Sequence, residues 1–222
     1  MLTDHLFYGC RNLRSIELPE GVTEIQSDAL NDCGLVEITL PEKIQKISPV
    51  AVGGDRFTEF RVSSDSRYFY TGKYGELYLR NGSVLIAMPS GRTGYVELPD
   101  SVCGIGRHAF CKSRISKIKF GSGVEIVGNS AFSDSELEEV EFNGSLKYIS
   151  HSAFRGCRLK TVSIPDGCAV EGDAFEGCPL TEVNYHGASS LDLPDECMRP
   201  KVYVPKNDLK ARADQHYRDQ DL

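Results

Sequence analysis

The sequence lacks the features that mark several common functional classes. It contains no run of about 18 apolar residues, so it predicts no membrane-spanning helix. Acidic residues outnumber basic ones, 32 to 25, and the net charge is −7. Nucleic-acid binding is therefore not expected, because phosphates require a basic stripe. No two cysteines have the Cys-x-x-Cys spacing that marks many zinc and thiol-redox sites.

The start of the chain lacks the pattern of a signal peptide. Residues 1–6 contain no basic segment followed by an apolar one. We expect a cytoplasmic protein if Met1 is the true start, or otherwise a domain whose export signal is not in this chain. Leu2, Phe7 and Cys10 also begin the chain in the middle of a repeat, so we expect further repeats upstream or a partner at that end.

What the sequence does contain is a repeat of 22 residues. Apolar residues recur at this step, with Leu98, Phe120, Phe142 and Ile164 in one series and Phe110, Phe132 and Phe154 in another. A period in this range predicts a solenoid. A coil of this length cannot bury its own apolar side chains, so successive coils must stack and share one core.

The repeat predicts the elements of each coil. Alternating apolar residues, as in Ile118-Lys119-Phe120, predict a strand that buries one face. The following Ala-Phe pair suits a helical or 3-10 turn that places a ring in the core. We therefore expect a repeat solenoid, mainly β with short helical turns, that forms a single domain over residues 1–222. Residues 202–205 are expected to form the last strand, and residues 205–222 a helical C-terminal cap.

Residues 63–95 interrupt the repeat. The step from Val62 to Leu98 is 36 residues instead of 22. Asn81-Gly82 lies between two apolar segments and predicts a β-hairpin, which we expect to project from the stack. This stretch is rich in aromatic residues, namely Tyr68, Phe69, Tyr70, Tyr74 and Tyr78. They suit either a contact patch or a small core beneath the insertion, and we favour the core.

Most of the eight cysteines follow the repeat. Cys10, Cys33, Cys157 and Cys178 each lie three residues after an expected core residue, which favours small buried thiols. Disulfides between neighbouring coils, Cys10 to Cys33 or Cys157 to Cys178, are the alternative, because stacking brings equivalent backbones within disulfide range.

The sequence offers no catalytic centre. The histidines fall at unrelated repeat positions, and they are His5, His108, His151, His186 and His216. No serine or cysteine has a histidine that the repeat would place beside it. We recognise no phosphate-binding loop and no metal-ligand cluster. The chain is therefore not expected to be an enzyme, to bind a cofactor or to hold a metal.

The repeat resembles that of a known family. Leu13-x-x-Ile16-x-Leu18-Pro19, followed by Val22-Thr23-x-Ile25 and by an Ala-Phe-x-x-Cys such as residues 153–157, is similar to the bacterial BspA-like leucine-rich repeat. Residues 74–78 and 85–89 resemble the hairpin repeat of that family, and residues 202–217 resemble its usual end. The resemblance implies a right-handed solenoid with a concave parallel sheet, commonly exported or at the cell surface of gut and oral bacteria, where several members bind proteins.

Residues between the buried strand positions are expected to line the concave sheet. The candidate binding residues are Glu37, Glu59, Arg61, Tyr95, Glu97, Lys117, Lys119, Glu139, Glu141, Glu182 and Tyr203. Parallel rungs stack in register, so Lys117 and Lys119 should lie between Glu97 and the pair Glu139 and Glu141. The face is either a solvated surface that neutralises itself or a docking surface for a protein partner. The sequence is also compatible with a structural spacer in a larger repeat protein and with a glycan-binding module.

Overall fold

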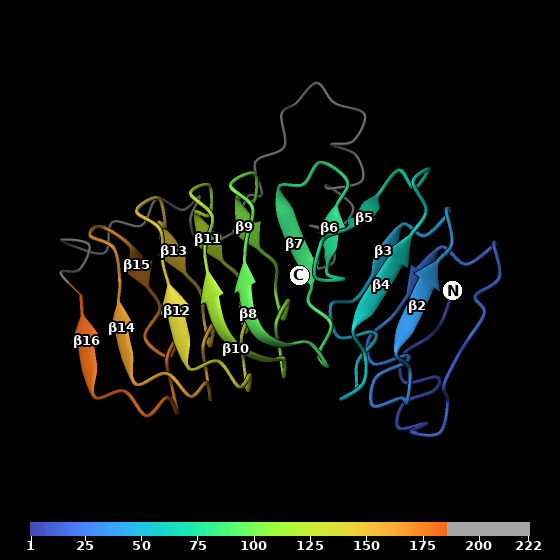
Figure 1. Cartoon of the computed structure of the whole chain (residues 1–222), viewed down its shortest axis with the longest axis horizontal. Coiled ribbons are helices and arrows are strands. Elements are labelled where there is room, and N and C mark those ends of the chain that lie inside the picture. Colours follow the sequence, from blue (N-terminus) through green and yellow to red (C-terminus); the bar gives the residue numbers. More distant parts are fainter. Residues whose placement is uncertain (186–222) are drawn as a thin grey trace.

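The computed structural model describes residues 1–185 and shows an elongated stack of about seven coils with a two-layered arrangement of strands (Figure 1). The coils follow one another from the N-terminal end to β16 along the long axis. This confirms the predicted repeat solenoid. The strand expected at residues 202–205 and the helical cap expected at residues 205–222 lie outside the described residues.

The concave sheet contains the strands from the Leu-x-x-Ile-x-Leu part of the repeat. They are β2 (Glu37–Leu40), β4 (Glu59–Val62), β8 (Thr93–Glu97), β10 (Arg114–Lys119), β12 (Glu139–Glu141), β14 (Thr161–Ser163) and β16 (Glu182–Asn184). Hydrogen bonds join them in three groups, β2 with β4, β8 with β10 and β12, and β14 with β16. Every pairing is parallel, and the register follows the repeat, with Ile118 opposite Val140.

The back sheet contains shorter strands from the Val-x-x-Ile part of the repeat and from the insertion. They are β1 (Glu24–Ile25), β3 (Lys46–Ile47), β5 (Phe69–Thr71), β6 (Leu77–Leu79), β7 (Val84–Ala87), β9 (Gly104–Ile105), β11 (Ile126–Val127), β13 (Tyr148–Ile149) and β15 (Ala169–Val170). β1 pairs with β3, and the other strands form one sheet in the order β15-β13-β11-β9-β7-β6-β5. Its pairing is parallel from β7 to β15 and antiparallel from β5 to β7.

Tight turns lead each coil from the back sheet toward the next concave strand. In a central coil, the N–H groups of Ala131, Ser133 and Ser135 each donate to a carbonyl three residues earlier, as in the expected 3-10 turn. Ser130 and Asp134, however, have positive φ values of 52° and 57°. Such residues cannot continue a right-handed helix, and no helix forms within residues 1–185. The turns still place Phe132 in the core.

A column of phenylalanine rings runs through the core of the C-terminal coils. Phe132 stacks on Phe110 and on Phe154, with ring centroids 4.5 and 4.9 Å apart, and Phe154 stacks on Phe175 at 5.1 Å. These separations match the spacing of neighbouring strands, so the column follows directly from in-register stacking. Phe110, Phe132 and Phe154 are fully buried, as the 22-residue step predicts.

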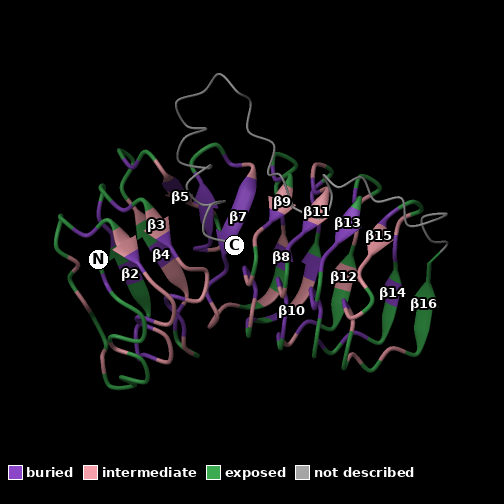
Figure 2. Ribbon diagram, turned by 180° about the vertical axis from the view of Figure 1, so that it is seen from behind, coloured by how far each residue is buried: buried purple, intermediate pink, exposed green. Residues whose placement is uncertain are grey.

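The insertion forms the predicted hairpin, but the hairpin does not project from the stack. β6 and β7 pair antiparallel on either side of Asn81-Gly82 and belong to the back sheet. Both strands are buried along their whole length, as Figure 2 shows for β7. The reason is that β7 supplies the rung next to β9, with Leu85 opposite Ile105. The expectation of a projecting hairpin is therefore wrong.

The hairpin also separates two apolar cores. Alternate residues of β6 face opposite ways, so Leu77 and Leu79 join the N-terminal cluster, whereas Tyr78 joins the C-terminal cluster. Phe69 packs in the N-terminal cluster and is fully buried. The insertion aromatics thus belong mainly to the core, as favoured from the sequence. They form a wall between two cores, and they do not form a separate small core beneath the insertion.

A buried carboxylate organises the turn before β6. Glu76 is 1% exposed. One of its oxygens accepts a hydrogen bond from the backbone N–H of Tyr74 at 2.6 Å, and the other accepts one from the Tyr78 hydroxyl at 3.0 Å. Burial, together with the charge of Glu76, raises the pKa of Tyr78, so the phenol stays a donor. Hydrogen bonds to both oxygens are what make a buried carboxylate tolerable.

The phenylalanine column gives a first prediction. Phe132→Ala removes a ring stacked on both sides and should lower the free energy of unfolding by about 3 to 5 kcal/mol, measured by urea denaturation. Glu141→Ala, on the exposed concave face, is the control and should change stability little. Equal losses from the two variants would contradict the assignment of buried and exposed faces.

The buried carboxylate gives a second prediction. Tyr78→Phe leaves one oxygen of Glu76 without its donor and should cost about 1.5 to 3 kcal/mol in the same assay, because the lost bond is to a charged group. Tyr185→Phe is the matched control: its hydroxyl donates to the Cys168 carbonyl, but the side chain is partly exposed. A smaller loss in Tyr78→Phe than in Tyr185→Phe would show that Glu76 does not depend on this bond.

Candidate binding surface

Charged side chains pair across the central strands of the concave sheet. Lys117 Nζ on β10 lies 2.9 Å from Glu139 Oε1 and 2.6 Å from Glu141 Oε1, both on β12. On the other side, Lys119 Nζ lies 2.9 Å from Glu97 Oε1 on β8. The sequence-based prediction that the two lysines lie between these glutamates is confirmed. The five strand positions are fixed because the parallel register places Lys117 opposite Glu139, and Lys119 opposite both Glu97 and Glu141.

A second group of charges lies on the N-terminal part of the same sheet. Arg61 on β4 reaches back to β2, where its Nη2 lies 2.6 Å from Glu37 Oε2. Its Nε lies 3.2 Å from Glu59 Oε2 on the same strand. The sequence placed all three residues on this face but did not predict that one guanidinium would bridge two carboxylates. The fork of donors on arginine makes this geometry possible.

The pairs shift the protonation of the groups that form them. Hydrogen bonds from Lys117 lower the pKa of Glu141, and bonds to Glu141 and Glu139 raise the pKa of Lys117. A hydrogen bond to Glu97 likewise raises the pKa of Lys119. All of these groups contact solvent, which screens their attraction. The pairs therefore fix the pattern of charge on the face more than they stabilise the fold.

The insertion fills the gap in the concave sheet between β4 and β8. The backbone N–H of Phe60 on β4 donates to the carbonyl of Gly75 at 2.9 Å. Gly75 has a φ of 82°, and a Cβ there would lie 2.4 Å from the carbonyl oxygen of Thr58, so only glycine fits. On the far side, the backbone N–H of Glu97 on β8 donates to the Tyr74 hydroxyl at 3.3 Å.

Two cations flank the tyrosine in this gap. Lys73 Nζ lies 4.6 Å from the centre of the Tyr74 ring, and Arg92 Cζ lies 5.4 Å from it. Both distances suit cation–π contacts. Sequence analysis missed Lys73 and Arg92 as parts of this face, because they lie outside the repeat. The only signal in the sequence was their place at the two ends of the predicted hairpin.

The remaining predicted site residues have different positions. Tyr95, on β8 opposite Lys117, is 45% exposed and is the large aromatic side chain of the central concave strands. Glu182 is exposed on β16, away from the central charged group. Tyr203 lies outside the described residues. The structure thus brings together the residues of β8, β10 and β12, and separately those of β2 and β4.

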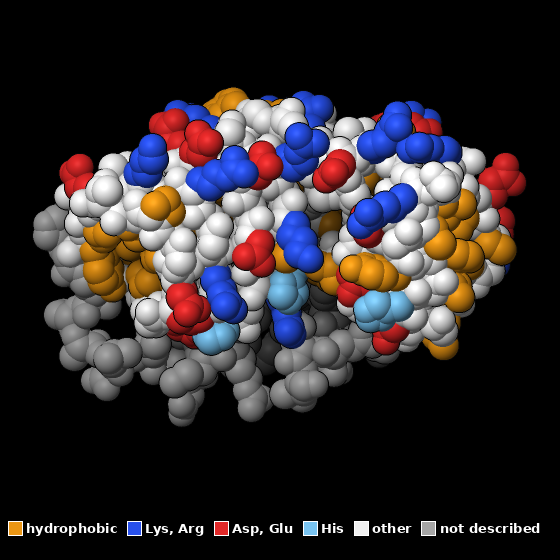
Figure 3. All heavy atoms as spheres, turned by 90° about the horizontal axis from the view of Figure 1, so that it is seen from below, with side chains coloured by type: hydrophobic (Ala, Val, Ile, Leu, Met, Phe, Trp, Pro, Cys, Tyr) orange, Lys and Arg blue, Asp and Glu red, His pale blue; other side chains and the backbone are white. Residues whose placement is uncertain are grey.

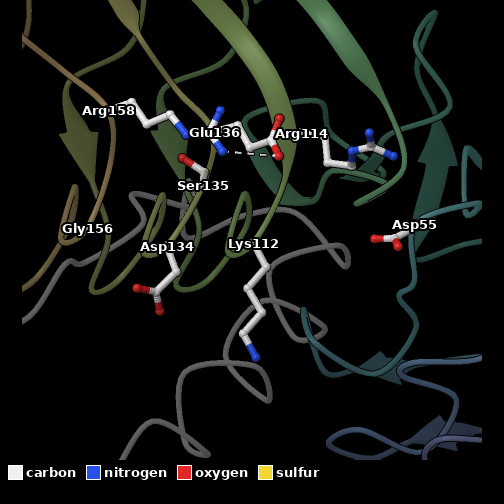
Figure 4. Close-up of a pocket in the computed structure, with 8 residues that line it drawn as sticks. All are labelled: Asp55, Lys112, Arg114, Asp134, Ser135, Glu136, Gly156 and Arg158. Carbon is white, nitrogen blue, oxygen red and sulfur yellow. Dashed lines mark ion pairs between the residues drawn. The ribbon is translucent and has the colours of Figure 1, made fainter.

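The turns at the lower end of the concave strands form an open depression. Its lining alternates in charge, and Glu136 and Arg158 point toward one another from neighbouring coils, with Glu136 Oε1 3.4 Å from Arg158 Nη2 (Figure 4). Seen from below, acidic and basic side chains are interleaved over this end of the coils (Figure 3). The depression is shallow and polar, so it has neither the enclosure nor the apolar lining of a typical small-molecule site.

One group of potential metal ligands was missed from the sequence. His151, Glu171 and Asp173 each offer a ligand atom, and these atoms lie within 4.8 Å of one another. Each side chain already has a partner, since His151 Nδ1 lies 2.9 Å from Asp173, Ser152 donates to Asp173 at 2.6 Å, and Tyr148 donates to Glu171. The histidine comes from the turn after β13, and the acids come from the turn after β15, so only the folded turns unite them.

The cysteines of the described coils are free thiols, and most lie in the core. Cys33 and Cys157 are buried, as predicted, Cys168 is buried as well, and Cys178 is partly buried. Cys10 is exposed, so the prediction of a core thiol is wrong there. Among the described residues, its coil has a neighbouring coil on one side only.

Comparison with family models identifies the repeat. The model described as "BspA type Leucine rich repeat region" matches in six copies over residues 1–77 and 91–196. The chain belongs to the BspA-type leucine-rich repeat family. The gap between the matched ranges, residues 78–90, covers the end of β6, the hairpin turn and β7, where the insertion departs from the repeat. The family resemblance inferred from the sequence is therefore confirmed.

Solved structures support the same family. The chain is similar to a leucine rich cell surface protein from Faecalibacterium prausnitzii, at 25% identity and a TM-score of 0.70, over 85% of this chain and 57% of that one. It is also similar in fold to the pneumococcal vaccine antigen PcpA, at 23% identity and a TM-score of 0.65, over 72% of this chain and 42% of that one. The BspA-type chain thus spans about half the length of these relatives.

A search of curated proteins found no match to the chain.

Within residues 1–185, no helix has the length and apolar character needed to cross a bilayer. The leucine-rich repeat fold is generally non-enzymatic.

The central ion pairs predict a measurable titration. The folded-state pKa of Glu141 lies below its ordinary value of 4.5, so the pair stabilises the fold above the unfolded-state pKa and loses its effect as the pH falls through the lower folded-state value. Lys117→Gln should raise the pKa of Glu141 toward 4.5 in a carboxyl NMR titration. Lys147→Gln removes a different ion pair, Lys147 with Glu125 at 3.0 Å, and should leave Glu141 unchanged. An unshifted Glu141 in Lys117→Gln would contradict the pairing.

Proposed function

We propose that this chain is a non-enzymatic protein-interaction module that binds a protein partner on the concave sheet. The observation that supports this most is the group of paired charges on β8, β10 and β12, which lies beside the exposed ring of Tyr95. Repeat solenoids commonly bind partners on such extended surfaces. Exposed aromatic rings among ordered polar groups are typical anchors of protein interfaces.

The charge of the surface favours a basic partner. The outward strand positions of the described concave sheet carry six carboxylates and four cations, a formal excess of two negative charges. The acids are Glu37, Glu59, Glu97, Glu139, Glu141 and Glu182, and the cations are Arg61, Arg114, Lys117 and Lys119. A partner that presents lysine or arginine would meet complementary charge, which increases the rate and specificity of association. Binding should therefore weaken as salt is added.

Charge inversion tests the proposal without removing the ion pairs. The variant E97K/K117E/K119E/E139K/E141K keeps every central pair but reverses its polarity, so the fold should be retained. Mass spectrometry quantifies the proteins that each chain captures. Those that the wild-type chain captures and this variant does not would be partners of the concave face. Their capture should fall at least tenfold in the variant and decline with added salt.

The matched control reverses a pair beside the back sheet. The double variant E125K/K147E inverts the contact between Glu125 and Lys147 and should capture the same proteins as wild type. A structural spacer would give the same captured set for all three proteins, and that result would refute the proposed binding surface. Circular dichroism of each variant establishes that the fold is intact.

We extend the proposal to display at a bacterial cell surface. The support is the family itself and the description of the Faecalibacterium relative as a cell surface protein. Antibody labelling of intact cells of the source organism tests this part separately. Labelling that requires permeabilised cells would contradict surface display but would leave the concave-sheet proposal standing.

A further inference from the structure

We propose that Cys157 and Cys178 form an intramolecular disulfide that cross-links two neighbouring coils under oxidising conditions. The two residues hold the same place in successive repeats, 21 residues apart. Each N–H donates to the carbonyl of the phenylalanine three residues earlier, Phe154 for Cys157 and Phe175 for Cys178. The backbones of the two turns are therefore superimposable along the stack.

The coils are close enough for the bond at this point. The N–H of Gly156, next to Cys157, donates at 2.8 Å to the carbonyl of Glu176 in the following coil. Phe154 and Phe175 stack at 5.1 Å. Neighbouring strands lie about 4.8 Å apart, and disulfides join residues whose Cα atoms are about 4.4 to 6.8 Å apart. The cross-link therefore requires no large backbone movement.

Side chains in this column already touch from coil to coil. Cys157 Sγ lies 3.4 Å from the hydroxyl oxygen of Ser135, its counterpart one coil earlier. Each of the two thiols donates to a phenylalanine carbonyl of the preceding coil, Cys157 to Phe132 at 3.1 Å and Cys178 to Phe154 at 3.0 Å. The two sulfurs therefore hold the same place in neighbouring turns.

The two thiols differ in a way that suits stepwise oxidation. A hydrogen bond from the Cys157 thiol would stabilise an ionised Cys178 and lowers the pKa of Cys178, whereas the same contact and burial raise the pKa of Cys157. Cys178 is also the more exposed of the two. It is therefore the thiol that ionises first and meets an oxidant from solvent, since the thiolate is the attacking species.

The oxidant is a small disulfide such as oxidised glutathione. The Cys178 thiolate attacks one sulfur of that disulfide, breaks its S–S bond and releases one glutathione thiolate. Cys157 then loses its proton and attacks the Cys178 sulfur of the mixed disulfide, which releases the second glutathione thiolate. Two electrons pass from the protein thiols to the oxidant, and the two protein thiol protons end on the two glutathione molecules or in solvent.

The bond would hold a coil that is little buried. In β16 all three residues are exposed, including the apolar Val183, so few packing contacts retain this last described coil. Joining residues 157 and 178 closes a loop that contains the strands β14 and β15. A cross-link here restricts separation of the two coils.

The test uses the full chain incubated with oxidised glutathione and then denatured, with free thiols blocked by N-ethylmaleimide. Peptide mass spectrometry should find Cys157 joined to Cys178, and the intact chain should be two hydrogen masses lighter for this bond. Cys178→Ser should abolish the bond and leave Cys157 fully alkylated. It should still fold, because Ser113 and Ser135 occupy the same column.

Cys103→Ser is the matched control, since Cys103 is exposed and belongs to no such column, and it should retain the cross-link. Any of four results would overturn the proposal: both thiols alkylated after oxidation, Cys178 carrying only a bound glutathione, Cys178 joined to another cysteine such as Cys197, or a cross-link lost equally in Cys103→Ser.

Discussion

The structure depends on one constraint: a single coil of about 22 residues cannot bury its own apolar side chains. Each coil is stable only against a neighbour that repeats its outline, and hydrogen bonds between parallel strands then impose a common register. The column of Phe110, Phe132 and Phe154 follows inside the stack, because equivalent rings meet at the strand spacing. The paired charges follow outside it, because Lys117 must lie opposite Glu139.

The same register brings side chains of one chemical type together along the stack. A side chain that recurs every 22 residues becomes a continuous row, whether it is a ring, a charge or a thiol. Ser135, Cys157 and Cys178 form such a row beneath the turns, just as Glu97, Lys119 and Glu141 form one on the concave sheet. A different residue type at one repeat position in one coil therefore changes the surface at that coil, while the core of the BspA-type stack stays the same.

Features governed by the period could be predicted from the sequence. The solenoid, the buried phenylalanines and the lysines between glutamates all follow from counting 22 residues. The hairpin at Asn81-Gly82 was also predictable, because that dipeptide favours its turn. Its burial was not, since nothing in the local pattern shows that β7 replaces a repeat strand beside β9.

Features that depend on the geometry of turns or on long side chains were missed. Arg61 reaches across to Glu37 through side-chain flexibility that the strand pattern does not encode. Tyr74 closes the gap before β8 because the turn that contains it approaches β4 through Gly75. His151, Glu171 and Asp173 meet only because two successive turns stack. Residues outside the strands therefore need coordinates before their neighbours can be named.

The wall formed by β6 and β7 has a consequence for how such a chain can change over evolutionary time. Because Tyr78 and Leu77 belong to different apolar clusters, the coils on the N-terminal side and the coils on the C-terminal side of the hairpin have separate cores. Duplication or loss of a coil on one side leaves the other side's packing intact. The number of coils on one side of the hairpin, and the binding surface that those coils form, can therefore change without changes to the core on the other side.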